Sequence, residues 1–245
     1  MNRWKLTFEY EGSSFRGWQK QPDQRTAEGE IEKALSILCQ TEIDIIGQGR
    51  TDAGVHARAQ IAHADLPESF QKERIMHAMK GLLPQDIAMV DAVLTDPDFH
   101  ARFDAVSRRY SYIVLERKSP LYRNRAWNCG YTLNYEILDD LAASVIGEHN
   151  FKNFCIPPEG SHLTTICTIT ESIWEQEGNQ LIYYIEGNRF LRHMVRRLVG
   201  SMIQVASEKL DFPEFYAMLR GEKVAKKGHT APAHGLYLEK VIYIK

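Results

Sequence analysis

A glycine-rich stretch near residue 50 combines residue types that could do chemistry. Segment 47–60 reads GQGRTDAGVHARAQ and holds one carboxylate, Asp52, two positions after Arg50, with His56 and Arg58 following closely. A nearby guanidinium favours the ionised form of a carboxylate even where water is excluded. An ionised, partly desolvated aspartate without a proton-shuttling partner is better suited to nucleophilic attack than to proton relay. Turn aspartates also bond their own backbone, so the spacing alone leaves both interpretations of Asp52 open.

The same stretch does not match a phosphate-binding loop. Gly49 and Gly54 have the spacing of the first part of GxxxxGK[ST], but Val55 and His56 stand where lysine and serine or threonine must be. The lysine that neutralises phosphate is therefore missing. We expect no nucleotide cofactor.

Metal binding and paired-carboxylate chemistry are also disfavoured. His56 and His63 are seven positions apart, without an HExxH motif or paired cysteines, so they are not a convincing metal site. A glycosidase needs two facing carboxylates roughly 5–9 Å apart. Asp44 and Asp65 exist, but neither has comparable glycine-rich surroundings. We expect no metal.

The composition is that of an ordinary globular protein. The 245 residues are 44% hydrophobic and 25% charged, with a net charge of −2, so the overall charge does not announce nucleic acid. Basic residues nevertheless gather in two stretches, and such patches on a balanced background can bind phosphate. The stretches hold Arg102, Arg108, Arg109, Arg117, Lys118, Arg123 and Arg125, and then Arg189, Arg192, Arg196 and Arg197.

The cysteines and the first segment indicate a cytoplasmic protein. The four cysteines show no CxxC spacing, and reduced thiols are the simplest interpretation. Charged residues interrupt the first segment, so no signal peptide is expected. No apolar run approaches the ~20 residues that span a bilayer, so no membrane association is expected.

Hydrophobic patterning predicts α+β structure in two halves, 1–104 and 105–245. In the first half we expect the order strand, helix, strand, strand, helix, strand, which suggests a ferredoxin-like unit. The segments are residues 3–10, a helix from Thr26, then 43–46, 57–64, 70–83 and 87–94. In the second half we expect a strand at 106–116, a helix capped by Asn134, a hairpin turning near 178–179, a helix over 189–205 and a strand at 236–245.

Four stretches together resemble the tRNA pseudouridine synthase A family. GRTDAGVHA (49–57) resembles the active-site signature of that family, and YEGSSFRGWQKQ (10–21) its N-terminal strand and loop. SRRYSYIV (107–114) is similar to its second signature, while GNRFLRHMVRRLVG (187–200) and TAPAHGLYL (230–238) look like its C-terminal elements. The resemblance spans nearly the whole chain and keeps the order of the motifs.

The resemblance implies a set of catalytic residues. The catalytic aspartate falls on Asp52, its neighbouring arginine on Arg50 and the active-site tyrosine on Tyr110. The arginine that partners the aspartate falls on Arg196, with the adjacent Arg197 as the alternative.

The resemblance also implies a fold, a reaction and partners. The fold would be two ferredoxin-like halves whose antiparallel sheets join into one extended sheet, with the active-site cleft between them. The reaction would convert uridine to pseudouridine in the tRNA anticodon stem-loop, at tRNA positions 38, 39 and 40. Because this is an isomerisation, it needs no cofactor. The enzyme would be a homodimer whose two subunits grip one tRNA.

Two segments offer groups for binding RNA. Arg16, Trp18 and Lys20 form an aromatic and basic loop suited to the RNA backbone. On a helix over residues 189–205, Arg189, Arg192 and Arg196 share a face. The opposite face is an apolar stripe of Leu191, Val195, Leu198 and Met202. We expect the substrate to contact Tyr110, Arg16, Trp18, Lys20, Arg58, Arg189, Arg192 and His193.

Two other functions remain possible from the sequence. One is a non-catalytic RNA-binding or RNA-folding module, and the other is a hydrolase with an aspartate nucleophile. The hydrolase would release free uracil, whereas a pseudouridine synthase keeps the base attached.

Overall fold

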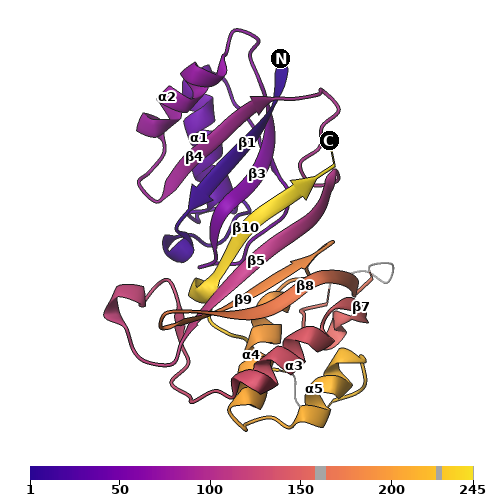
Figure 1. Cartoon of the computed structure of the whole chain (residues 1–245). Coiled ribbons are helices and arrows are strands. Elements are labelled where there is room, and N and C mark those ends of the chain that lie inside the picture. The colour runs from indigo at the N-terminus through magenta and orange to yellow at the C-terminus, as the bar shows by residue number, and fades with distance from the viewer. Residues whose placement is uncertain (158–163, 225–227, 245) are drawn as a thin grey trace. The chain divides into compact units, whose positions relative to one another are not determined.

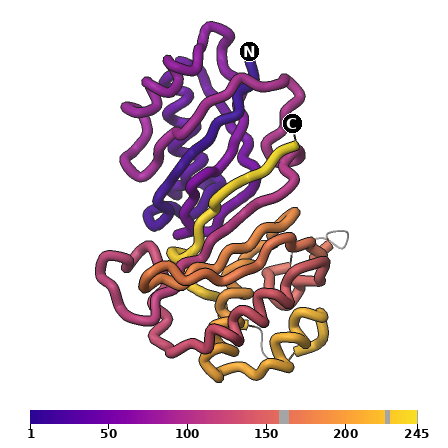
Figure 2. The backbone as a smooth tube through the Cα atoms, viewed as in Figure 1, coloured from indigo at the N-terminus to yellow at the C-terminus, as the bar shows by residue number. Residues whose placement is uncertain are grey.

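The computed structural model describes residues 1–157, 164–224 and 228–244. The chain divides into two compact units, Met1–Val106 with Tyr237–Lys245, and Ser107–Leu236. The division expected at 104/105 thus differs at the C-terminal end. The last strand, β10 (Leu236–Tyr243), pairs in parallel with β3 (His56–Leu66), and all of it but Leu236 belongs to the first unit. Figure 2 shows these two segments, far apart in the sequence, side by side.

The first unit is ferredoxin-like, as expected. Its remaining elements are β1 (Asn2–Tyr10), α1 (Ala27–Cys39), β2 (Ile46–Gly47), α2 (Lys72–Leu82) and β4 (Ile87–Leu94), with a short 3-10 helix at Gly12–Ser14. The strands β4, β1 and β3 lie in that order and are antiparallel, and β2 pairs antiparallel with β3. The two helices pack against each other beside this sheet (Figure 1).

The predicted periodicities explain this unit. Along β1, the alternating residues Leu6 and Phe8 are fully buried. Helix α1 begins where Thr26 accepts a hydrogen bond from the Gly29 N–H at 3.3 Å, and it buries Ile31 and Leu35 on the same side. The expected strand at 43–46 is confirmed only at its end, where β2 is formed.

The second unit is also α+β, with the strand order β5-β9-β8-β7, all antiparallel. Its strands are β5 (Ala105–Leu115), β6 (Trp127–Asn128), β7 (Gly147–Asn150), β8 (Ile166–Glu177) and β9 (Gln180–Gly187). Its helices are α3 (Tyr135–Ser144), α4 (Met194–Ala206) and α5 (Phe212–Leu219), with 3-10 turns at Pro120–Tyr122, Phe151–Asn153 and Ala233–Gly235. Helix α3 packs on both β8 and α4 (Figure 1).

Most predictions for this unit are confirmed. The hairpin of β8 and β9 turns at Gly178, and Asn134 caps α3 by accepting from the Ile137 N–H at 3.2 Å. The prediction of a helix from residue 189 is wrong, since α4 begins at Met194 after His193 in the left-handed conformation (φ 65°). Among the described residues, no helix has the length and hydropathy needed to cross a membrane.

Candidate functional site

Asp52 lies on a tight turn between β2 and β3. The turn is closed by the Val55 N–H, which donates to the Asp52 carbonyl oxygen at 3.1 Å, and Gly54 adopts φ +81°. Such a backbone angle favours glycine. The side chain of Asp52 is neither buried nor fully exposed. The turn therefore presents one carboxylate at the edge of the first unit's sheet.

The loop that follows β1 holds this turn from one side. The Trp18 N–H donates to the Thr51 carbonyl oxygen at 3.1 Å, and the Tyr10 hydroxyl lies 2.7 Å from the Thr51 hydroxyl in a buried hydrogen bond. Gly17 (φ +98°) passes so close that a Cβ there would lie 2.8 Å from the same carbonyl oxygen. A side chain at position 17 would therefore push the two loops apart.

Two buried glutamines hold the turn from the other side. The Gln48 N–H donates to the Ile61 carbonyl oxygen at 2.8 Å, and its side-chain Nε2 donates to Gln60 Oε1 at 3.0 Å. Gln60 Nε2 in turn donates to the Gly49 carbonyl oxygen at 3.0 Å. Both arms of the turn are thus fixed to the body of the unit, which is what positioning a reactive group requires.

The histidines near Asp52 have structural partners. His56 is 2% exposed, its Nδ1 accepts the Gly12 N–H at 3.0 Å, and its ring stacks on Tyr237 with centroids 4.6 Å apart. His63 Nδ1 accepts the Ala101 N–H at 3.1 Å. Over the described part of the chain, no group of three or more His, Cys, Asp or Glu side chains could hold a metal ion.

Arg50 is exposed, and its Nε donates to Gln19 Oε1 at 2.8 Å. Gln19 also donates to Glu28 Oε2 at 2.7 Å. Sequence reasoning missed both Gln19 and Glu28, since neither residue has a spacing that signals chemistry. The structure reveals them because it brings three segments together around Arg50.

The structure corrects the expected role of Trp18 in the RNA-facing loop. Trp18 is 1% exposed, packs against Gly47 and donates its indole N–H to Glu28 Oε1 at 3.1 Å. A ring so buried has no face open to a base, and Trp18 instead supports the turn. Arg16 is exposed, and Lys20 forms an ion pair with Glu32 at 2.7 Å while its own side chain stays 56% exposed.

Arg58 lies on β3, in the first unit. It is exposed, forms an ion pair with Glu239 at 3.1 Å and places its guanidinium 5.2 Å from the Tyr237 ring centroid. These contacts orient the side chain and leave a positive charge at the surface.

Tyr110 lies on β5 in the second unit and is 9% exposed. It pairs with Ile185 of β9 and meets the ring of Phe190 edge-on, with centroids 5.1 Å apart. Its neighbour on the same face, Tyr112, is fully buried and donates its hydroxyl to the Pro232 carbonyl oxygen at 2.7 Å. Tyr112 is thus a packing residue.

The two adjacent arginines of α4 have different surroundings. Arg197 donates from Nη1 to the Cys155 carbonyl oxygen at 2.5 Å and from Nε to the Thr230 hydroxyl at 3.4 Å. Arg196 donates from Nε to the Ala231 carbonyl oxygen at 2.8 Å, and this bond holds the Nε edge of its guanidinium in place. Arg197 thus links α4 to the two segments that hold Cys155 and Thr230.

The other expected contacts of this region precede α4. Arg189, half-buried, donates to the Thr164 carbonyl oxygen at 3.3 Å, whereas the Arg192 side chain is exposed. Because Arg189 and Arg192 lie outside the helix, they do not share a helical face with Arg196. The apolar stripe of Leu191, Val195, Leu198 and Met202 is buried, as predicted.

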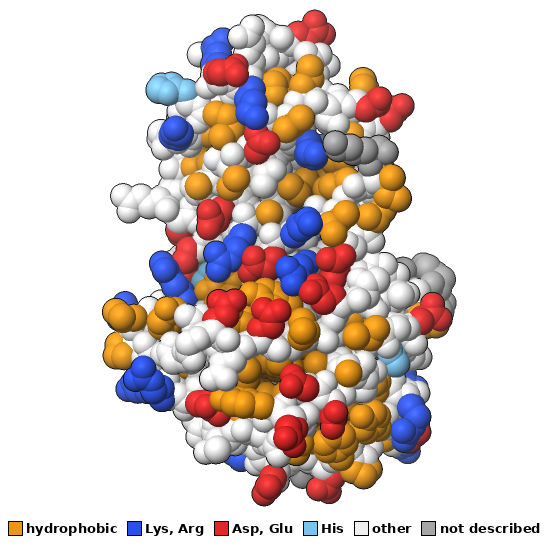
Figure 3. All heavy atoms as spheres, viewed as in Figure 1, with side chains coloured by type: hydrophobic (Ala, Val, Ile, Leu, Met, Phe, Trp, Pro, Cys, Tyr) orange, Lys and Arg blue, Asp and Glu red, His pale blue; other side chains and the backbone are white. Residues whose placement is uncertain are grey.

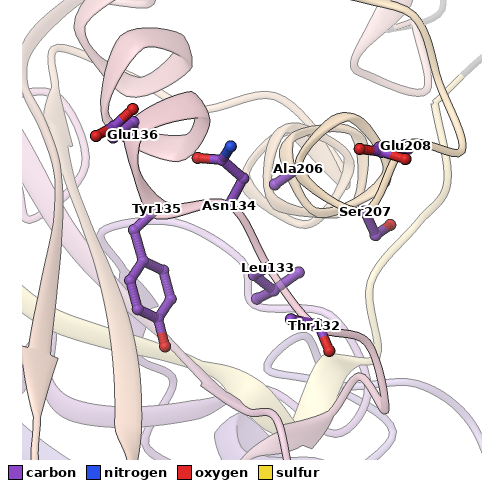
Figure 4. A pocket seen from close by; sticks show the side chains of 8 residues that line it. All are labelled: Thr132, Leu133, Asn134, Tyr135, Glu136, Ala206, Ser207 and Glu208. Atoms are coloured by element: carbon purple, nitrogen blue, oxygen red, sulfur yellow. The ribbon is translucent and has the colours of Figure 1, made fainter.

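Neither the surface charge nor the pocket between α3 and α4 marks the predicted site. On the face in Figure 3, Lys and Arg side chains are interspersed with Asp and Glu. A pocket in the second unit lies where α3 begins and α4 ends, and its residues serve the ends of these helices (Figure 4). It is lined by Thr132, Leu133, Asn134, Tyr135, Glu136, Ala206, Ser207 and Glu208. No predicted site residue is among these.

Comparison with known proteins identifies the family. A family described as tRNA pseudouridine synthase matches residues 6–104 and 141–244. A tRNA pseudouridine synthase A of Bacillus subtilis (strain 168) is 39% identical, over 98% of this chain and 99% of the relative. A protein of the same name from Dictyoglomus thermophilum is 38% identical, over 99% of this chain and all of the relative. This chain therefore belongs to the tRNA pseudouridine synthase A family.

Proposed function

We propose that this protein converts uridine to pseudouridine in the anticodon stem-loop of tRNA, at tRNA positions 38, 39 and 40, with Asp52 as the nucleophile. Membership of the family supports tRNA pseudouridine synthesis. The observation that carries the assignment to Asp52 is its place on a turn that is hydrogen-bonded to the body of the unit on both sides. A carboxylate presented in this way loses little freedom when it reacts.

The reaction needs one nucleophile and an active site that keeps the detached uracil bound. The N1–C1′ bond breaks, uracil rotates, and a C5–C1′ bond forms while C5 loses its proton and N1 gains one. Atoms and electrons balance without a cofactor. The Asp52 carboxylate would start the reaction by adding to C6 of the base, by attacking C1′, or by removing the C2′ proton on a glycal route.

Arg50, Arg196 and Tyr110 have supporting roles in this proposal. An arginine would hold the carboxylate ionised and oriented, and the contacts of Arg197 with Cys155 and Thr230 favour Arg196 over Arg197 for this part. Tyr110 would stack on the target base, which is worth about 1–3 kcal/mol per base. The target nucleotide must be flipped out of its stem at a cost of a few kcal/mol.

Exposed or half-exposed basic groups would bind the RNA backbone around the catalytic residues. Arg16, Lys20, Arg58, Arg189, Arg192 and His193 are the residues that we propose for this role. Since the net charge is −2, the patches of one subunit are modest, and a homodimer would align several of them along one tRNA. We place this activity in the cytoplasm, where its tRNA substrate is found.

Release of tritium from C5-labelled uridine in an anticodon stem-loop transcript tests the function. The wild-type protein should release tritium, and Asp52→Ala should release none while still binding tRNA in a filter assay. Asp52→Asn is the matched control that keeps the shape and removes the charge, and it should also be inactive. Turnover by purified D52A would refute the nucleophile assignment. Binding without tritium release by the wild type would favour an RNA-binding module, and free uracil would favour a hydrolase.

A further inference from the structure

A chain of hydrogen bonds runs from Arg50 to a buried carboxylate. Arg50 Nε donates to Gln19 Oε1 at 2.8 Å, and Gln19 Nε2 donates to Glu28 Oε2 at 2.7 Å. Glu28 is 6% exposed and accepts two more bonds, from Trp18 Nε1 at 3.1 Å and from the Lys20 N–H at 2.6 Å. Arg50 therefore stands at the surface end of a network rooted in the core of the first unit.

This network fixes which way the Gln19 amide points. An amide has a donor end and an acceptor end. Because Glu28 accepts the Nε2–H, the Oε1 end of Gln19 must face outward, toward Arg50. A guanidinium has no acceptor of its own, so the reverse orientation of the amide would place donor against donor.

The environment of Glu28 makes it the anchor. It lies in the first turn of α1, where the helix dipole favours a carboxylate. Burial raises the pKa of the Glu28 carboxyl, against the bonds from Lys20 and Trp18, which lower it. A protonated Glu28 would point its own O–H among three donors, so the network is complete in the carboxylate form.

The same loop also touches the turn that carries Asp52. The Trp18 N–H donates to the carbonyl oxygen of Thr51, the residue before Asp52. Residues 18–20 thus contact both Glu28 and the turn, and they supply the tether of Arg50.

We propose that Gln19 and Glu28 are positioning residues for the reaction, which hold the Arg50 guanidinium in place beside the turn of Asp52. This inference rests on the proposed roles of Asp52 and Arg50. Gln19 acts directly on Arg50, and Glu28 acts one hydrogen bond further away by orienting Gln19. Neither residue touches the substrate in this proposal.

Gln19→Met tests the tether, because it keeps the length of the side chain and removes both hydrogen bonds. Loss of a hydrogen bond to a charged group should lower kcat about tenfold, with the tRNA Kd unchanged. Gln24→Met is the matched control, since Gln24 is an exposed residue of the same loop. Glu28→Gln leaves one acceptor too few for the three donors that surround position 28. It should lower kcat less than Gln19→Met does, because residue 28 acts on Arg50 only through Gln19.

A double-variant comparison separates positioning from stability. On an Arg50→Ala background, Gln19→Met should cause no further fall in kcat. Any fall in melting temperature caused by Gln19→Met should be the same with and without Arg50, because the bond between Gln19 and Glu28 is lost in both cases. An equal fall in kcat with and without Arg50, or wild-type kcat in both Q19M and E28Q, would overturn the inference. The wild type and D52A are assayed together with these variants. If the proposed function is wrong, the wild type will release no tritium. If only this inference is wrong, the wild type will be active and the Gln19 and Glu28 variants will not behave as stated.

Discussion

The close approach of Gly12 to the turn of Asp52 allows a quantitative test. Gly12 begins the 3-10 turn after β1, and its N–H donates to His56 Nδ1 at 3.0 Å. A Cβ at this position would lie 1.9 Å from the Val55 carbonyl oxygen and 2.5 Å from the Val55 carbonyl carbon. Both of these atoms belong to the backbone next to the turn, so a change of side-chain rotamer cannot relieve the clash. The perturbation is the substitution Gly12→Ala.

The expected loss follows from the displacement that the methyl group requires. To reach 3.0 Å, below which Cβ contacts essentially never occur, the atoms must separate by about 1.1 Å. A misplacement of about 1 Å at a reacting group can cost on the order of 100-fold in rate, which is about 2.7 kcal/mol in the activation barrier. We therefore expect kcat for tritium release to fall about 100-fold in G12A.

The assay pairs single-turnover tritium release with thermal unfolding of the same preparations. Gly81→Ala is the control, because Gly81 lies on α2 and a Cβ there has no neighbour within 4 Å. That variant should keep wild-type kcat and gain about 0.5–1 kcal/mol of helix stability. If G12A kept both its melting temperature and its kcat, the tight contact with Val55 would not exist and the reasoning would be refuted.

Two further predictions concern buried groups of the first unit. Tyr10→Phe and Thr51→Val should each destabilise the fold by about 1–3 kcal/mol, because each removes one partner of the buried hydrogen bond between the two hydroxyls. The double variant should lose less than the sum of the two single losses. Chemical denaturation of the wild type and the three variants measures this, and simple additivity would contradict the bond. Burial lowers the pKa of His63 to about 4, so the folded state resists a proton that the unfolded state binds below about pH 6.5. Stability should therefore be lost as pH falls from about 6.5 toward 4, by about 2 kcal/mol between pH 7 and pH 5. His63→Asn, which keeps an acceptor for the Ala101 N–H, should flatten this slope relative to an exposed control, His77→Asn; an unchanged slope would rule out His63 as its source.

The sequence by itself determined the features that depend on local pattern. Alternation along residues 3–10 predicts β1, since every second side chain of a strand points to the same side. Thr26 and Asn134 predict the starts of two helices, because a capping side chain bonds to backbone N–H groups a few residues along. The motif around Asp52 identified the family, and Gly54 within it predicted a turn, since its φ of +81° is a backbone angle that favours glycine.

Tertiary structure decided whatever depends on segments distant in sequence. Trp18 stands among basic residues in the sequence, yet Gly47 and Glu28 enclose it, so its burial could not be read from its neighbours. The last strand belongs to the first unit from Tyr237 onward, where it pairs with β3, a strand about 180 residues earlier in the chain. The tether of Arg50 likewise exists only once the loop and α1 are brought together, because hydrogen bonds between side chains depend on positions in space rather than on spacing along the chain.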